Sequence, residues 1–109
     1  MDPAQQILLH ILEKIVKDIK NKGCKAKTYQ IEPRCWMISN QKRKRTVAFG
    51  HVPDVNDENL GRIIGAFEVN LVKLKWASAE GFTHNEMIDK DLGVFEMVEI
   101  SEIPNILCP

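Results

Sequence analysis

The fold is decided by residues 34–51, which read RCWMISNQKRKRTVAFGH. Two runs rich in β-branched and aromatic residues flank a strongly basic four-residue segment. Pro33 precedes the first run, and Pro53 follows the second. Runs of this composition, bounded by turn formers, are typical of two strands joined in a hairpin. We therefore expect a β-hairpin whose loop is formed by residues 41–44.

The register of this hairpin follows from the separation of large and small side chains. When Asn40 faces Arg45, the large apolar side chains share one face, and a slip of one residue would turn Trp36 and Ile38 to the other face. The expected pairs are Trp36 with Phe49 and Ile38 with Val47 on the large face, and Ser39 with Thr46, Met37 with Ala48 and Cys35 with Gly50 on the small face. We expect the large face to be in the core.

Length and composition indicate a single domain over residues 1–109. The chain has 109 residues, of which 44% are apolar, enough for one hydrophobic core. The apolar run near the N-terminus is short and is interrupted by His10, Glu13 and Lys14. It therefore predicts neither a signal peptide nor a membrane span. We expect an intracellular protein, cytoplasmic or nuclear, with no membrane partner.

The cysteines are three in number: Cys24, Cys35 and Cys108. An odd number without metal-type spacing disfavours both a disulfide framework and a zinc site. The expectation is three reduced thiols, no metal and no other cofactor.

Charge is divided unevenly along the chain although the formal net charge is zero. Residues 1–50 contain eleven Lys or Arg and four Asp or Glu, a balance of +7, and residues 51–109 contain four and eleven, a balance of −7. Such asymmetry indicates an anionic partner for the basic half, or pairing of the two halves within or between chains. The alternative is a solvated surface whose charges are segregated without a partner.

The first helix is predicted over residues 3–22. Asp2 is a suitable N-cap, Pro3 suits the first helical position, and Gln5 can complete a capping box. Apolar residues recur at helical spacing, and Gly23 is a natural stop. The recurring apolar positions are Leu8, Leu12, Ile15 and Ile19, with Leu9, Ile11 and Val16 widening the stripe.

The remaining elements complete a predicted α+β domain. Residues 24–31 alternate loosely and indicate a strand at a sheet edge, where lysines discourage further pairing. After the hairpin, Leu60–Phe67 has a helical apolar face, with Gly61 and Gly65 as a small-residue surface. Residues 71–77 alternate as a strand, although helical spacing is also present.

The C-terminal third starts with Thr83 and Glu86, a capping-box pair that predicts a short third helix ending at Gly93. A last strand follows over 94–100, and then an apolar tail over 103–109 whose prolines prevent regular structure throughout. The predicted order is α-β-β-β-α-β-α-β, a largely antiparallel sheet with helices packed on one face.

The most informative functional feature is the basic turn. Contiguous cations on a hairpin tip can contact phosphates and displace counterions, which gives affinity without reading sequence. We therefore expect a nucleic-acid-binding protein, DNA or RNA, whose phosphate-contacting residues are Lys42, Arg43, Lys44, Arg45, Arg34, Lys25 and Lys27. Tyr29 and Trp76 are the candidate stacking faces for bases. A nuclear localisation signal or a merely soluble loop would have the same composition.

An enzymatic function is not expected. Carboxylates at Asp54, Asp57 and Glu58 near His51 resemble a hard-cation site, but Asp57 and Glu58 also suit the start of a helix. A thiol dyad of Cys35 with His51 or His84 lacks any activating context in the sequence. No catalytic residue is predicted.

The alternative function is a protein-interaction module. Gly61 and Gly65, the apolar tail and the opposed charges of the two halves would suit a homodimer, or a small inhibitor or adaptor that docks on a larger partner. Such a protein would form its interface without nucleic acid.

Overall fold

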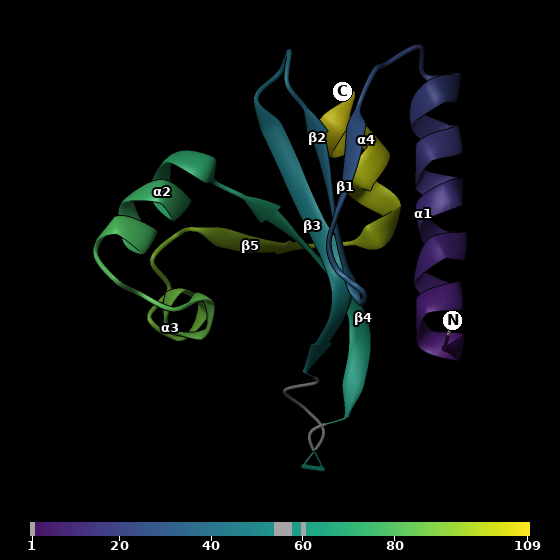
Figure 1. Ribbon diagram of the computed structural model, residues 1–109. Helices are drawn as coiled ribbons and strands as arrows, with labels where there is room; N and C mark the ends of the chain where they lie inside the picture. The colour runs from purple at the N-terminus through teal and green to yellow at the C-terminus, as the bar shows by residue number, and fades with distance from the viewer. Residues whose placement is uncertain (1, 54–57, 60) are drawn as a thin grey trace.

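The computed structural model describes residues 2–53, 58, 59 and 61–109 and shows one compact α+β domain (Figure 1). Five strands form an antiparallel sheet in chain order: β1 (Lys27–Glu32), β2 (Cys35–Asn40), β3 (Arg45–Pro53), β4 (Arg62–Val69) and β5 (Phe95–Val98). The helices are α1 (Pro3–Asn21), α2 (Leu71–Ala79), α3 (His84–Asp89) and α4 (Ile103–Leu107), and a 3-10 turn covers Ile100–Glu102. The predicted fold class and the largely antiparallel sheet are confirmed.

The central hairpin has the predicted register. Asn40 faces Arg45, Ile38 faces Val47, and Trp36 faces Phe49, and the three pairs of the small face also match. Ile38, Val47 and Phe49 are fully buried, whereas Trp36 is half-buried against the same core. Separation of large and small side chains therefore sets the register, as a sheet with one covered face requires.

The first helix is confirmed as α1, and the predicted N-cap at Asp2 and the turn at Gly23 are both present. Asp2 accepts a 2.8 Å hydrogen bond from the backbone N–H of Gln5. This bond, with help from the nearby Arg34 guanidinium, lowers the pKa of the Asp2 carboxyl. The buried side chains of the helix are Leu8, Leu12, Ile15 and Ile19.

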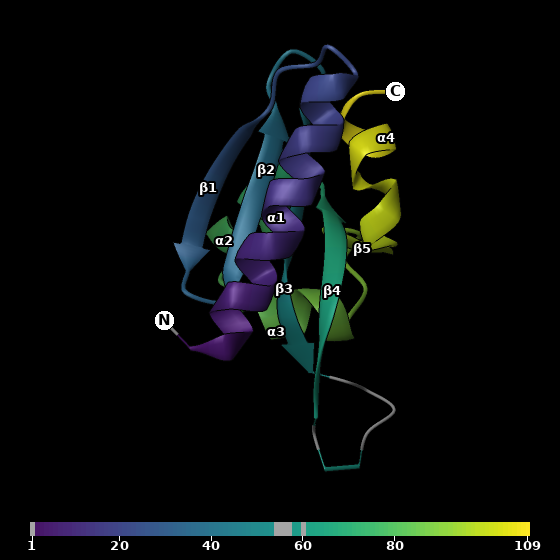
Figure 2. The same cartoon turned by 90° about the vertical axis from the view of Figure 1, so that its right-hand side faces the viewer.

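The helices lie on both sides of the sheet. α1 and α4 cover one face and lie side by side, as the two views show (Figures 1 and 2). This face contains the main core. α2 and α3 lie on the other side, where they form a small cluster of their own around Ala77, Met87 and Val94. The arrangement with helices on one face therefore applies only to α1 and α4.

The predicted helix over 60–67 is wrong, because residues 62–67 of this segment belong to strand β4. Gly65 faces Gly50 across the sheet, and a Cβ at Gly65 would lie 2.8 Å from Cγ2 of Val52. Glycine therefore permits close packing within the sheet and does not form a helix surface. Strand pairing overrides the helical spacing here. Asn56 and Asp54, either of which could have capped such a helix, lie outside the described residues.

The predicted strand over 71–77 is also wrong, because the segment belongs to helix α2. The deciding residue is Asn70, whose side-chain oxygen accepts a 3.0 Å hydrogen bond from the backbone N–H of Lys73. An Asn at this position is a strong N-cap. The spacing of the apolar residues fits both a strand and a helix, so the N-cap at Asn70 determines that this segment is helical.

The other predicted elements are present with shifted bounds. β1 is an edge strand, as predicted, but begins at Lys27. The Thr83–Glu86 capping box is present, and α3 ends at Asp89, before Gly93. The last strand is limited to Phe95–Val98, and the apolar tail contains the five-residue helix α4.

The expectation of three reduced cysteines is wrong for two of them. Cys24 and Cys108 form a disulfide across 84 residues of sequence, with their Cα atoms 6.0 Å apart. Spacing in the sequence does not show this pair, because only the packing of α4 beside α1 brings the two residues together. Cys35 is free and half-buried, and burial, with a smaller effect of Glu32, raises the pKa of its thiol.

Within the described part of the chain, no helix is both long enough and apolar enough to cross a bilayer.

Candidate nucleic-acid interface

The C-terminal end of α1 directs a lysine-rich connection towards the hairpin. Gly23 has a left-handed backbone (φ 70°), its N–H donates to the carbonyl of Lys20, and the N–H of Cys24 donates to the carbonyl of Ile19. These two bonds form a Schellman motif, in which glycine is favoured because it has no Cβ. The chain therefore reverses at Gly23 and leads through Lys25 into β1.

Asn40 fixes the base of the basic turn. Its side chain is only 3% exposed, and its amide nitrogen donates to the carbonyl of Leu107 at 2.7 Å and to Sγ of Cys24 at 3.2 Å. Its oxygen accepts from the backbone N–H of Arg43 at 3.3 Å. One buried amide therefore joins the turn, the disulfide and the last helix.

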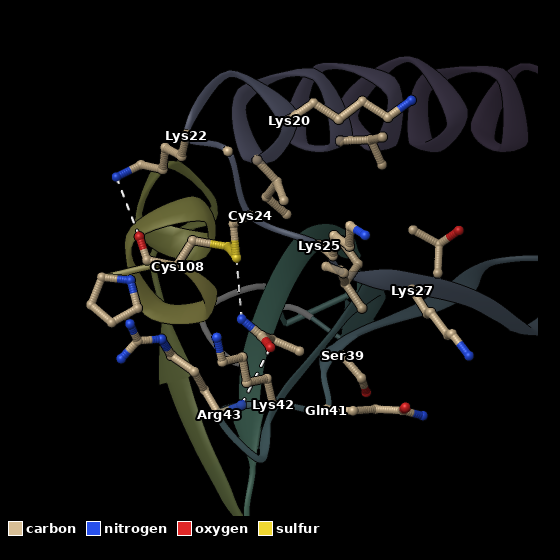
Figure 3. A pocket seen from close by; sticks show the side chains of 18 residues that line it. Lys20, Lys22, Cys24, Lys25, Lys27, Ser39, Gln41, Lys42, Arg43 and Cys108 are labelled. Atoms are coloured by element: carbon tan, nitrogen blue, oxygen red, sulfur yellow. Dashed lines mark hydrogen bonds between the residues drawn. A yellow bond between two sulfur atoms is a disulfide. The ribbon is translucent and has the colours of Figure 1, made fainter.

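A basic groove of about 910 Å³ lies between the end of α1, the connection into β1 and the basic turn, next to the disulfide. Its lining includes six cationic side chains, and none of the described residues that line it has an acidic side chain. Figure 3 shows Lys20 and Lys22, at the end of α1 and just after it, on one side of the disulfide and the cations of the hairpin turn on the other. The cations of this basic groove are Lys20, Lys22, Lys25, Lys27, Lys42 and Arg43.

Four of the seven predicted phosphate-contacting residues meet in the basic groove: Lys25, Lys27, Lys42 and Arg43. Arg45 is instead engaged with Glu68, which it contacts at 2.7 Å through both Nε and Nη2. This hydrogen-bonded carboxylate raises the pKa of Arg45. The Glu68 carboxylate therefore partly neutralises the positive charge of Arg45.

Arg34 does not join the basic groove. It lies in the turn between β1 and β2, at the opposite end of β2 from the basic turn, and its Nη2 is 3.5 Å from the Asp2 carboxylate. The six residues of β2 separate the two turns by about 20 Å. Arg34 therefore lies far from the predicted phosphate-contacting residues of the basic turn, because the two hairpin turns that flank one strand lie at its opposite ends.

Lys20 and Lys22 belong to the basic groove, although they are not among the seven predicted phosphate-contacting residues. The signal was present in residues 20–27, KNKGCKAK, which contain four lysines in eight positions. Joining this run to the hairpin turn requires knowing that α1 packs along β2, which is a tertiary contact.

A second groove of about 1020 Å³ lies beyond the basic turn. Its charged lining residues are three cations and three carboxylates, so its formal charge is zero. These residues are Lys44, Arg45, Lys73, Glu68, Asp91 and Glu96. Uncharged residues that line this neutral groove include Tyr29, Ser39, Thr46, Leu71 and Val72.

The two candidate stacking residues have different surroundings. Tyr29 lines the neutral groove and is 43% exposed. Trp76 is exposed too, but lines neither groove and packs beside Phe82, with 6.2 Å between the ring centroids. Of these two residues, the structure therefore brings only Tyr29 close to the cations of the basic turn.

The catalytic alternatives gain no support from the described residues. Among those residues, no three His, Cys, Asp or Glu side chains are grouped to hold a metal ion, and Asp54 and Asp57 lie outside the described part. Cys35 pairs with Gly50 in the sheet, so it and His51 point to opposite faces and form no dyad. Nε2 of His51 is buried and has no hydrogen-bond partner among the described residues.

Comparisons with known protein families, with curated proteins and with solved structures give no match, so function is inferred from the grooves themselves.

Proposed function

We propose that this protein binds nucleic acid through the basic groove, by contacts to phosphates that do not depend on base sequence. The observation that carries the proposal is the convergence of six cations from three separate segments on one groove, with no acidic side chain among the described residues that line it. Lysine and arginine that neutralise phosphates release condensed counterions, which favours binding at low salt.

The rigidity of the basic groove supports the same function. The lysines follow a helix end closed by a Schellman motif, and the turn with Lys42 and Arg43 is fixed by Asn40 and, through it, by the disulfide. Cations on a backbone that is held in place lose less conformational entropy when they bind than cations on a free tail. Five of the six are lysines, which act as point charges and do not impose a bidentate geometry. Such a set suits contacts to a repeating phosphate backbone.

The test is a binding titration with matched variants. We expect the wild type to bind a labelled 12-nucleotide oligonucleotide at low salt, and Lys42→Gln/Arg43→Gln to bind it more weakly. The control is Lys14→Gln/Lys75→Gln, which removes two exposed lysines that line neither groove. Equal affinity for the two double variants would contradict the proposal, as would no binding by the wild type.

A second candidate function is association with another copy of the chain. It is favoured by exposed apolar side chains, above all Val72, which is 81% exposed on α2, and by the +7 and −7 halves of the chain. Complementary charges would steer two copies together, with weaker steering at high salt. Sedimentation at low and high salt without nucleic acid tests it. A monomer at all concentrations would exclude this candidate.

A further inference from the structure

We infer that the nucleic acid is single-stranded and that it places bases in the neutral groove while its phosphates lie in the basic groove. This inference rests on the proposed function and goes beyond it by naming the class of partner. It starts from the position of the two grooves on either side of the basic turn.

The two grooves meet at the turn between β2 and β3. Ser39, Asn40 and Gln41 line both of them. Lys42 and Arg43 line the basic groove, whereas Lys44, whose backbone is left-handed (φ 55°), lines the neutral groove. The turn is thus a ridge with one groove on each side, and a ligand that occupies both must bend over it.

A double helix does not bend over a ridge of four residues. Duplex DNA has a persistence length of about 150 base pairs, and even moderate bends over 20–30 base pairs cost several kcal/mol. A single strand rotates about its backbone bonds and can cross such a ridge. The shape of the surface therefore selects a single strand.

The charges distinguish what each groove accepts. Six cations, with no acidic side chain among the described lining residues, suit phosphates in the basic groove. In the neutral groove the carboxylates of Asp91 and Glu96 repel phosphates, but carboxylates accept hydrogen bonds from the amino groups of bases. The neutral groove is therefore suited to bases.

The neutral groove also contains a surface for stacking. Tyr29 projects from the edge strand β1, and Leu71 and Val72 at the start of α2 provide an exposed apolar surface. Every base has a π-face, so stacking on one aromatic ring tolerates any sequence. Tyr29 is the residue on which the inference depends most.

The experiment compares three probes: a 12-nucleotide single strand, its duplex, and linear inorganic polyphosphate, which has phosphates but no bases. We expect Tyr29→Ala to weaken binding of the single strand by about 5- to 150-fold and to leave polyphosphate binding unchanged. Tyr29→Trp retains binding of the single strand. Trp76→Ala, a matched loss of an exposed aromatic residue outside both grooves, has no effect. The duplex binds more weakly than the single strand.

A spectroscopic readout separates stacking from a structural effect. Tyr29 is the single tyrosine of the chain, so fluorotyrosine labelling gives one fluorine resonance. We expect this resonance to shift with the single strand and not with polyphosphate. An unshifted resonance, or a duplex that binds as tightly with no effect of Tyr29→Ala, would overturn the inference while leaving phosphate binding intact. Failure of all three probes to bind would instead overturn the proposed function.

Discussion

The side-chain amide of Asn40 donates a 2.7 Å hydrogen bond to the backbone carbonyl of Leu107, across 67 residues of sequence. The same nitrogen lies 3.2 Å from Sγ of Cys24 and the oxygen accepts from Arg43. The basic turn, the disulfide and the last helix are therefore parts of one buried network. The position of the cations in the basic groove depends on this network.

Replacing Asn40 should destabilise the protein. Asn40→Ala leaves the buried carbonyl of Leu107 without its partner, and we expect the free energy of unfolding to fall by about 1–3 kcal/mol. Denaturant titration measures this change. Asn105→Ala is the control, because its amide makes only an exposed 3.5 Å contact with Glu102. Equal midpoints for the two variants would contradict the role of Asn40.

The disulfide predicts how many thiols of the protein react before and after reduction. In denaturant without reductant we expect one reactive thiol, that of Cys35, and three after reduction. Reduction should lower the free energy of unfolding by about 2–4 kcal/mol, since the bond closes a long loop in the unfolded chain. Cys35→Ser should leave this difference unchanged. Three thiols in a sample never exposed to reductant would show that the pair is not formed.

The hairpin register predicts unequal costs for its two aromatic residues. Phe49 is 1% exposed, and Phe49→Ala should destabilise by about 3–5 kcal/mol. Trp36→Ala should cost less, because Trp36 is only half-buried. Thermal or denaturant unfolding of both variants checks the order of the two effects. A larger effect at Trp36 would contradict the packing described.

The capping box of α3 predicts a pH-dependent contribution to stability. The backbone N–H of Thr83 donates to the Glu86 carboxylate, which lowers the pKa of Glu86 in the folded protein. Because the folded pKa lies below the unfolded value, the stabilisation is present above about pH 5 and is lost as the pH falls through the folded pKa. Glu86→Gln should therefore have a lower melting temperature than the wild type at pH 6. A gap that stays constant down to pH 3 would contradict this assignment.

Local patterns predict those parts of the fold that are determined by neighbours in sequence. Capping residues and the apolar stripe predicted α1, and pairing of large with large side chains predicted the register of β2 with β3. Two segments were predicted with the wrong secondary structure: residues 60–67 were expected to form a helix, and residues 71–77 a strand. β4 is a strand because it pairs with β3 on one side and β5 on the other, a contact between distant segments.

The candidate site shows the same limit. Lys25, Lys27, Lys42 and Arg43 were predicted from local charge, and the structure brings them together. Lys20 and Lys22 join them only because α1 packs against the sheet, and Arg45 and Arg34 have carboxylate partners, Glu68 and Asp2, that are distant in sequence. The disulfide was not predicted from the sequence, because its two cysteines also come together only through a tertiary contact.

The central claim, phosphate contact by the basic groove, is tested most directly by the salt dependence of binding. For a single strand, the slope of log affinity against log salt is about −0.7 for each phosphate contact, so six cations correspond to a slope of up to about −4. Lys42→Gln/Arg43→Gln should make the slope less steep by about 1.4, and Lys14→Gln/Lys75→Gln should leave it unchanged. A wild-type affinity independent of salt, or the same slope in the Lys42→Gln/Arg43→Gln variant, would contradict the claim.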